Sequence, residues 1–200
     1  MKEIVVPGEM IEERPVRVRH GYVENGRTYS TILGIYNRES MSIVPLEGVW
    51  TPAIEDTVVG IVSGVKNGVY TVDLNYHGRC IIISGKFDRF SFRHGDVVEA
   101  KIKNIEEKNT IILYYPRLLS GGTIVDVKPA KVPRVMGKGD TMIRQISDNT
   151  KSHIIVGKNG RVWIKGGDVG LATAAILRIE KEAHVSGLTE RIREMIENKS

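Results

Sequence analysis

Hydrophobic and polar positions alternate along much of the first 118 residues, which predicts short strands rather than helices. Within residues 1–52 the alternation covers Val16–Arg19, Thr31–Ile35 and Met41–Val44, and Asn25-Gly26 supplies the chemistry of a tight turn. Pro45 and Pro52 discourage regular structure beyond this point. We therefore expect residues 1–52 to form a small strand-rich domain that serves for docking.

Residues 53–118 contain five further alternating segments, each of strand length and each bounded by turn or loop residues. Gly68 and Asn109 lie at the expected hairpin turns, and Lys86–Gly95 forms a longer polar loop. Five short strands with one long loop fit an OB-type barrel. The predicted strands are Thr57–Val65, Val69–Leu74, Arg79–Ile83, Val97–Ile105 and Thr110–Tyr115.

The pattern changes again in residues 119–200, where strand and helix periods alternate. An amphipathic helix is expected from Asp140, which is a suitable N-cap residue, and another from Asp168. Gly187 should break the second helix before a last amphipathic one that carries Leu188, Ile192, Met195 and Ile196. The predicted strands are one around Ile124–Val127, then Val132–Met136, Ser152–Val156 and Arg161–Lys165.

The order strand, helix, two strands, helix resembles a KH domain, and Val132–Ile146 resembles its GXXG region. Backbone N–H groups of such a turn, together with the following helix N-terminus, approach a nucleic-acid backbone. Gly137, Lys138 and Gly139 match the motif, but Asp140 stands where the family has its last glycine. A carboxylate there repels phosphate, so RNA contact by this loop stays open.

The second region resembles an S1-type RNA-binding domain at Asp56–Val62, Val72–Leu74 and Phe92–Val98. The expected fold class is thus mainly β plus α+β, in three parts. They are a strand-rich domain at 1–52, a five-stranded OB/S1-type barrel at 53–118, and a KH domain with a C-terminal helix at 119–200.

The charge is concentrated in the last of these parts. The chain has a net charge of +5 and a pI near 9.3, and residues 128–165 carry nine Lys/Arg against two Asp. Such an excess attracts phosphate and favours a nucleic-acid partner. The plainer alternative is a soluble protein with a basic end.

Binding of single-stranded RNA by the barrel requires aromatic side chains beside cations. Thr71 occupies the position where many S1-type domains carry a stacking aromatic, and Tyr70 shares a face with core residues, so we look to the loops. The alternative is a solvated loop with Phe87 and Phe90 tucked beneath it. The barrel candidates are Lys66, Tyr76, His77, Arg79, Lys86, Phe87, Arg89, Phe90, Arg93 and His94.

In the KH segment the RNA-binding candidates are Lys138, Arg144, Lys158 and Arg161. Gly157, Lys158, Asn159 and Gly160 form a second candidate loop. Asn-Gly is also ordinary tight-turn chemistry between strands, and Trp163 nearby suits a core position, so a structural role for this turn stays open beside RNA contact.

The sequence offers no catalytic site. The five histidines are scattered without metal-ligand spacing, and adjacent acids such as Glu55-Asp56 indicate solvated turns. Cys80 is the single cysteine, which excludes a disulfide framework, and an apolar strand makes it a buried thiol. We expect no catalytic residue, no metal and no cofactor. No apolar run approaches the roughly 20 residues that cross a bilayer, and the N-terminus lacks a secretory signal, which favours a cytoplasmic protein.

The whole chain resembles the RNA-binding cap subunit of the archaeal exosome. Ile155–Ile164 resembles the Gly-x-Asn-Gly motif of exosome cap KH domains, and Val5–Glu9 resembles the opening segment of the family. The resemblance implies a non-catalytic subunit, in a homotrimer or a mixed cap trimer on a hexameric phosphorolytic nuclease ring. Such a subunit recruits single-stranded RNA and guides it to the pore for 3'-to-5' degradation.

Two other classes of protein share these modules. A transcription elongation or antitermination factor also combines S1 and KH domains but normally carries a second KH domain, for which 200 residues leave no room. A phosphorolytic nuclease places KH before S1 and needs a large catalytic core. The order and length of the domains therefore favour the exosome cap.

Overall fold

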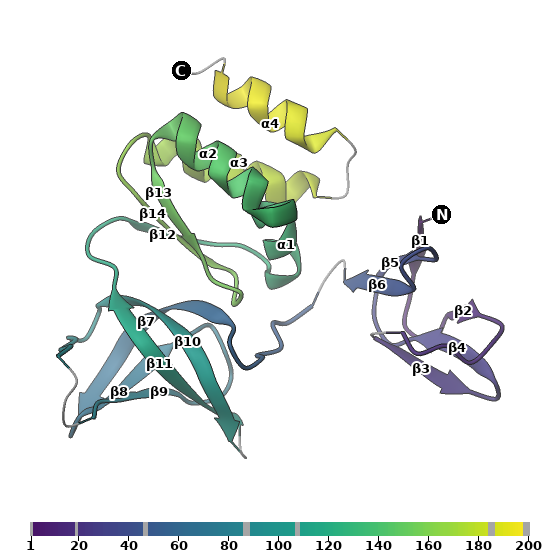
Figure 1. The fold of residues 1–200 in the computed structure, drawn as a ribbon, viewed down its shortest axis with the longest axis horizontal. Coiled ribbons are helices and arrows are strands. Elements are labelled where there is room, and N and C mark those ends of the chain that lie inside the picture. Colours follow the sequence, from purple (N-terminus) through teal and green to yellow (C-terminus); the bar gives the residue numbers. More distant parts are fainter. Residues whose placement is uncertain are drawn as a thin grey trace. The chain divides into compact units, whose positions relative to one another are not determined.

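The computed structural model describes residues 2–18, 20–45, 48–85, 89–106, 109–183 and 187–197. The chain forms two compact units, Met1–Val49 and Trp50–Ser200. The predicted fold class is confirmed: the chain is strand-rich α+β, with a closed five-stranded barrel followed by a KH domain (Figure 1). The barrel and the KH domain share one unit, and the division of the chain into three domains stays a prediction.

The first unit consists of two three-stranded antiparallel sheets, ordered β1-β5-β6 and β2-β4-β3. Asn25 and Gly26, at φ 50° and 75°, form the predicted turn between β3 and β4. The strands are β1 (Lys2–Val5), β2 (Met10–Glu12), β3 (Gly21–Glu24), β4 (Arg27–Ser30), β5 (Gly34–Asn37) and β6 (Ser42–Pro45). Its core is small and consists of Val5, Ile11, Val18, Tyr36 and Ile43.

Two strand predictions in this unit are wrong or displaced. The described part of Val16–Arg19, residues 16–18, is not a strand, because the Val16 N–H donates to the Thr28 hydroxyl, 2.9 Å away, rather than to a neighbouring strand. The segment predicted at Thr31–Ile35 bends first and becomes a strand only at Gly34.

The barrel contains all five predicted strands and closes in the order β10-β11-β9-β8-β7. β9 and β11 run parallel, and the other neighbours are antiparallel, which completes an OB-type topology. Tyr70 lies in the core, as predicted. The strands are β7 (Thr57–Lys66), β8 (Val69–Asp73), β9 (Cys80–Ile83), β10 (Val97–Glu106) and β11 (Thr110–Leu118).

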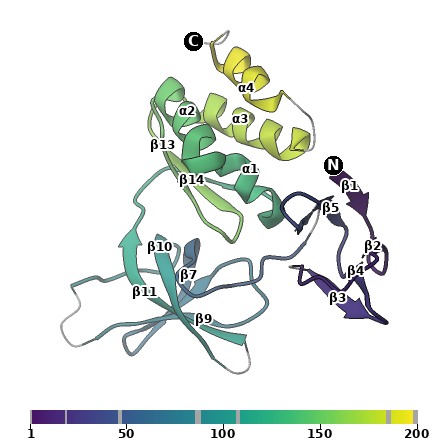
Figure 2. The ribbon, with the colours of Figure 1, turned by 45° about the vertical axis from the view of Figure 1, so that its right-hand side comes forward.

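The KH domain is a three-stranded antiparallel sheet, ordered β12-β14-β13, with its helices gathered on one side (Figures 1 and 2). Helix α4 packs on α2 and α3 through Leu188, Ile192 and Ile196, as the amphipathic pattern predicts. The elements are β12 (Thr123–Asp126), α1 (Val132–Met136), α2 (Thr141–Thr150), β13 (His153–Val156), β14 (Arg161–Lys165), α3 (Val169–Glu182) and α4 (Leu188–Glu197).

The segment Val132–Met136 corrects one prediction, because it is helix α1 rather than a strand. Val132 and Val135 are both buried, and a spacing of three residues places them on one helical face. Pro133 is accommodated because the first turn of a helix requires no N–H donor.

The two predicted N-caps behave differently. The Asp168 carboxylate accepts the Leu171 N–H at 2.8 Å and caps α3, as predicted. Asp140 has a left-handed backbone, at φ 62°, and its side chain makes no capping hydrogen bond to α2. The prediction that Asp140 caps α2 through its side chain is therefore wrong.

Candidate nucleic-acid interface

The turn between β13 and β14 joins the KH domain to the barrel. The Asn159 side chain is 3% exposed, and its amide pairs with the backbone of β7: the Val59 N–H donates to Oδ1 at 3.2 Å, and Nδ2 donates to the Val59 carbonyl at 2.8 Å. Nδ2 also donates to the Leu74 carbonyl at 3.0 Å, and the Lys158 N–H donates to the Thr57 carbonyl at 2.8 Å. The turn thus supplies hydrogen-bond partners to backbone N–H and C=O groups of the barrel, as an added strand would.

Arg161 stabilises the same junction through hydrogen bonds and ion pairs. Its guanidinium donates to the Asp73 carbonyl and, at 2.7 Å, to the Asp73 carboxylate, and it lies 3.3 Å from the Asp126 carboxylate. Burial alone raises the pKa of Asp73, but the hydrogen bonds from Arg161 and the Asn75 N–H, with the Arg161 charge, lower it below its ordinary value. Asp73 is therefore held as the charged partner of Arg161.

Apolar packing completes the junction. Val59 of the barrel, Leu119 of the connecting segment, and Ile155 and Trp163 of the KH sheet form one buried cluster. The Trp163 indole donates to the Gly121 carbonyl at 2.7 Å, which also fixes the connecting segment. These contacts explain why the barrel and the KH domain form one compact unit.

These contacts bear on the two interpretations of the Gly157–Gly160 turn. A Cβ on Gly157 would lie 2.3 Å from the Asn159 Oδ1, and one on Gly160, at φ 90°, would lie 2.3 Å from the Val127 carbonyl oxygen. Asn159 and Arg161 are buried in the junction, where both side chains hold the barrel. Lys158 remains exposed.

The GXXG-like loop lies between α1 and α2. Gly137 and Gly139 have φ of 75° and 60°, and Lys138 is exposed at the tip. The Lys158 ammonium lies 3.8 Å from the Met136 sulfur, so the β13–β14 turn reaches the end of α1. Two cations from distant segments, Lys138 and Lys158, therefore lie around the start of α2. Arg144 is exposed on α2, one helical turn after Thr141.

At the barrel, Tyr76, His77 and Arg79 lie in the connection between β8 and β9. The ring centroids of Tyr76 and His77 are 4.3 Å apart, and His77 Nε2 lies 3.2 Å from the Asn109 side-chain nitrogen. Arg79 is exposed beside them. This connection begins at Leu74, which accepts a hydrogen bond from Asn159, so it starts at the junction.

The remaining barrel candidates lie elsewhere. Lys66 is exposed at the β7–β8 hairpin, at the opposite end of β8 from the connection. Arg89, Arg93 and His94 are exposed in the β9–β10 loop. Phe90 instead packs on the barrel core, with its ring centroid 5.1 Å from that of Phe92. Lys86 and Phe87 lie outside the described residues.

The sequence interpretation missed Asn109 and Asp73 as parts of this region. Asn109 was recognised only as a turn residue, yet it meets His77 from 32 positions along the chain. Asp73 meets Arg161 from 88 positions away. Neither pairing has a local sequence signal, because barrel closure and domain docking create both.

Within the described residues, no group of three or more His, Cys, Asp or Glu is placed to bind a metal ion. Cys80 is buried as predicted, and burial, with the charge of Asp73, raises the pKa of its thiol to about 11. No helix in the described part of the chain has the length and apolar character needed to cross a membrane.

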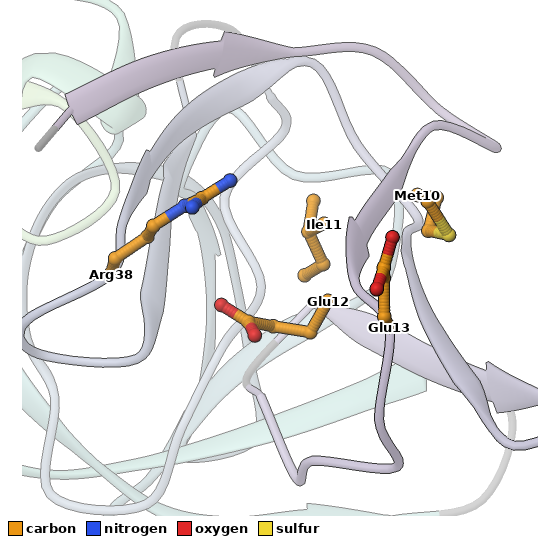
Figure 3. Close-up of a pocket in the computed structure, with 5 residues that line it drawn as sticks. All are labelled: Met10, Ile11, Glu12, Glu13 and Arg38. Atoms are coloured by element: carbon orange, nitrogen blue, oxygen red, sulfur yellow. The ribbon is translucent and has the colours of Figure 1, made fainter.

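The first unit contains a hollow of about 320 Å³, lined by Met10, Ile11, Glu12, Glu13 and Arg38 (Figure 3). The buried Tyr36 hydroxyl donates to Glu12 at 2.8 Å. Burial, with the Glu12 hydrogen bond and charge, raises the pKa of Tyr36 to about 12. A neutral tyrosine therefore supports the Glu12 carboxylate at physiological pH.

Comparison with known proteins places the chain in a family. A KH-domain family model matches residues 122–170. Over 99% of its length the chain is 37% identical to the exosome complex component Rrp4 of Pyrococcus furiosus, of which it covers 84%. The chain belongs to the Rrp4 family. The Rrp4 proteins of Thermococcus kodakarensis and Picrophilus torridus are 34% and 36% identical, over 98% and 96% of the chain and 85% and 91% of their own lengths.

A solved structure agrees with the Rrp4 assignment. A crystal structure described as that of an exosome complex RNA-binding protein matches with a TM-score of 0.66 and 28% identity. The match covers 76% of this chain and 97% of the other. The predicted resemblance is thus confirmed, and Rrp4 membership agrees with the prediction of a non-catalytic chain.

Proposed function

We propose that this Rrp4-family chain is a non-catalytic exosome subunit that binds single-stranded RNA at the junction of its barrel and KH domain. We call the side chains around that junction the junction surface, and define it as Lys138, Lys158 and His77, which are exposed, together with Tyr76, which is partly buried against the barrel core. The observation that carries the proposal is the buried Asn159 junction, which fixes the two cations and the two rings on a single unit.

The chemistry of the junction surface suits RNA of any sequence. Lys138 and Lys158 supply charge for phosphate, and the exposed ring of His77, which Tyr76 supports from the barrel core, supplies a face for stacking. Arg79, in the β8–β9 connection, and Arg144, on α2, are exposed and add further positive charge to the same unit. Contacts of this kind follow the backbone and stack any base, so they favour affinity over sequence choice.

The proposed role also includes assembly of the chain into an exosome complex. In the proposal, residues 1–52 dock on a hexameric phosphorolytic nuclease ring, three cap subunits surround its pore, and the junction surface guides RNA into the pore for 3'-to-5' degradation in the cytoplasm. Support comes from the relatives, which are named as exosome complex components, and from the separate compact unit Met1–Val49.

The RNA-binding part is tested with the purified chain and a labelled 12-nucleotide RNA, using fluorescence anisotropy at 50 mM salt. We expect binding of single-stranded RNA, weaker binding of an RNA duplex of equal length, and no shortening of the RNA after prolonged incubation with phosphate. Absence of binding at low salt would contradict the proposal. Release of nucleotides by the purified chain would contradict the non-catalytic role.

A further inference from the structure

The barrel carries an exposed aromatic side chain that the junction surface does not include. Tyr115 of β11 is 78% exposed, more than any other aromatic residue that the structure describes. It was not among the candidates from the sequence, where it is only the last residue of the predicted strand Thr110–Tyr115.

A β-bulge turns Tyr115 outward. Lys101 of β10 pairs with Tyr114, but Glu99 pairs with Arg117, so Tyr115 and Pro116 together oppose Ala100. Tyr115 has a φ of 48°, a left-handed conformation that is a clear outlier for a bulky residue. Ala100 is buried, whereas the Tyr115 ring is in solvent. Bulges that redirect a side chain in this way are enriched next to functional sites.

The Tyr115 ring contacts Tyr114, which is itself held in a network of charged side chains. The Tyr114 ring lies 4.6 Å from the Tyr115 ring, centroid to centroid, and the Tyr114 hydroxyl donates to Glu55. The Lys101 ammonium lies 3.5 Å from Glu55, and the Arg117 guanidinium donates to Glu99 at 2.8 Å. The Tyr115 ring is thus supported by Tyr114, and two ion pairs, Lys101–Glu55 and Arg117–Glu99, lie on the same two strands.

Tyr114, the neighbour of Tyr115, lies on a row of backbone pairs that leads to the junction surface. Tyr114 pairs with Lys101, Lys101 pairs with Thr57 of β7, and the Thr57 carbonyl accepts the Lys158 N–H. Adjacent strands are about 4.8 Å apart, so Tyr114 lies about 10 Å along this row from Thr57. RNA that contacts Lys158 can therefore continue onto β11.

We propose that Tyr115 is a base-stacking residue for single-stranded RNA, at a second binding position on the β10–β11 face of the barrel. The inference rests on the proposed RNA-binding function and extends it. The outward neighbours Glu99, Lys101 and Arg117 are charged, and Leu118, the next exposed apolar residue of β11, lies beyond Pro116 and Arg117. A protein interface requires a broader apolar centre, whereas one base requires only one ring face.

The test replaces Tyr115 by Asn, which tolerates the left-handed backbone but has no ring. Removing one stacking platform should weaken binding of a 12-nucleotide RNA by about fivefold to a hundredfold at fixed salt. Tyr115→Phe keeps the ring and should bind as the wild type does. Tyr22→Asn, at another exposed tyrosine in the first unit, is the matched control and should have no effect on RNA affinity.

The outcomes separate this inference from the function on which it rests. If the wild type binds RNA and Tyr115→Asn, folded by circular dichroism, binds equally well, the stacking role is overturned and the RNA-binding function stands. If the wild type does not bind RNA, both are overturned. If Tyr115→Asn binds RNA normally but fails to recover the other subunits of its complex, Tyr115 is a protein contact, which also overturns the inference.

Discussion

At the scale of single residues, Asn159 shows how one side chain can decide between two functions for a motif. Its amide contributes one acceptor and two donor bonds to the barrel backbone, all of them buried. Leaving a buried polar group without a partner costs more free energy of folding than a typical hydrogen bond contributes. The motif that resembles exosome cap KH domains therefore has a structural role in docking the two domains, and in the proposed function RNA contact belongs to the neighbouring Lys158.

Replacing Asn159 by Ala should destabilise the second unit by about 2–4 kcal/mol, because several backbone groups at the junction lose their partners while remaining buried. Urea denaturation followed by tryptophan fluorescence measures this, since Trp163 lies in the junction. Asn149→Ala, which removes a single bond from an exposed helix position, is the control and should cost below about 1 kcal/mol. Equal losses in the two variants would contradict the role of Asn159.

Asp73 makes the junction sensitive to acid. Its pKa is lowered in the folded chain, so its contribution to stability is complete above the ordinary value of 3.8 and is lost as pH falls through the folded value. The free energy of unfolding of Asp73→Asn should therefore fall below that of the wild type at neutral pH, and the difference should shrink below about pH 4.

The measurement is chemical denaturation at several pH values for the wild type and Asp73→Asn. Asp148→Asn, at an exposed position on α2, serves as the control and should leave the pH dependence of the wild type unchanged. A difference for Asp73→Asn that stays constant down to pH 2 would show that the charge of Asp73 does not stabilise the junction.

At the scale of elements, the sequence predicted the barrel better than the rest of the chain. All five strands follow from alternation, because each has one face toward a closed core. Helix α1 was mistaken for a strand, since five residues with a proline are too few to distinguish a period of 3.6 from a period of 2. Residues 16–18 alternate like a strand, but the Val16 N–H donates a hydrogen bond to the Thr28 hydroxyl. These residues therefore do not pair with a neighbouring strand.

The candidate site divides in the same way. Lys138 and Lys158 were predicted because they lie in recognisable loops, and their role in RNA binding stays a prediction. The sequence did not indicate that Lys158 lies beside Met136, because only the fold brings these segments together. Arg161 was expected on RNA because charge alone cannot distinguish a surface cation from one that pairs with Asp73 and Asp126. Tyr115 was missed because a bulge reverses the alternation on which the interpretation depends.

The loops around α2 give a prediction at this scale. Lys138→Glu combined with Lys158→Glu should weaken RNA binding by at least about tenfold at 50 mM salt, because two phosphate contacts become repulsive. The slope of log affinity against log salt should become less steep by about 1.4, since each contact to a single strand contributes about 0.7.

The matched control is Lys151→Glu combined with Lys181→Glu, which changes the net charge by the same amount. Lys151 lies at the far end of α2, about 15 Å from the GXXG-like loop for a ten-residue helix. Anisotropy titrations at four salt concentrations compare the two double variants. Equal effects would mean that total charge, and not the junction surface, determines RNA affinity.

At the scale of the whole molecule, the chain combines a small strand-rich unit with a larger unit in which barrel and KH domain are joined by Asn159, Arg161 and Trp163. Within the larger unit, the side chains proposed to bind RNA come from two domains and hold fixed positions relative to each other. That arrangement suits a subunit that presents RNA to a separate nuclease, which is the central claim of the proposed function.

The most direct measurement of that claim is the mass of the complex that contains this chain. The tagged chain, expressed at its native level, is recovered from its source cells, and the intact complex is weighed by native mass spectrometry. We expect a hexameric phosphorolytic ring with three cap subunits, at least one of them this chain. Recovery of the chain alone, or with RNA polymerase, would contradict the exosome role and favour a transcription factor.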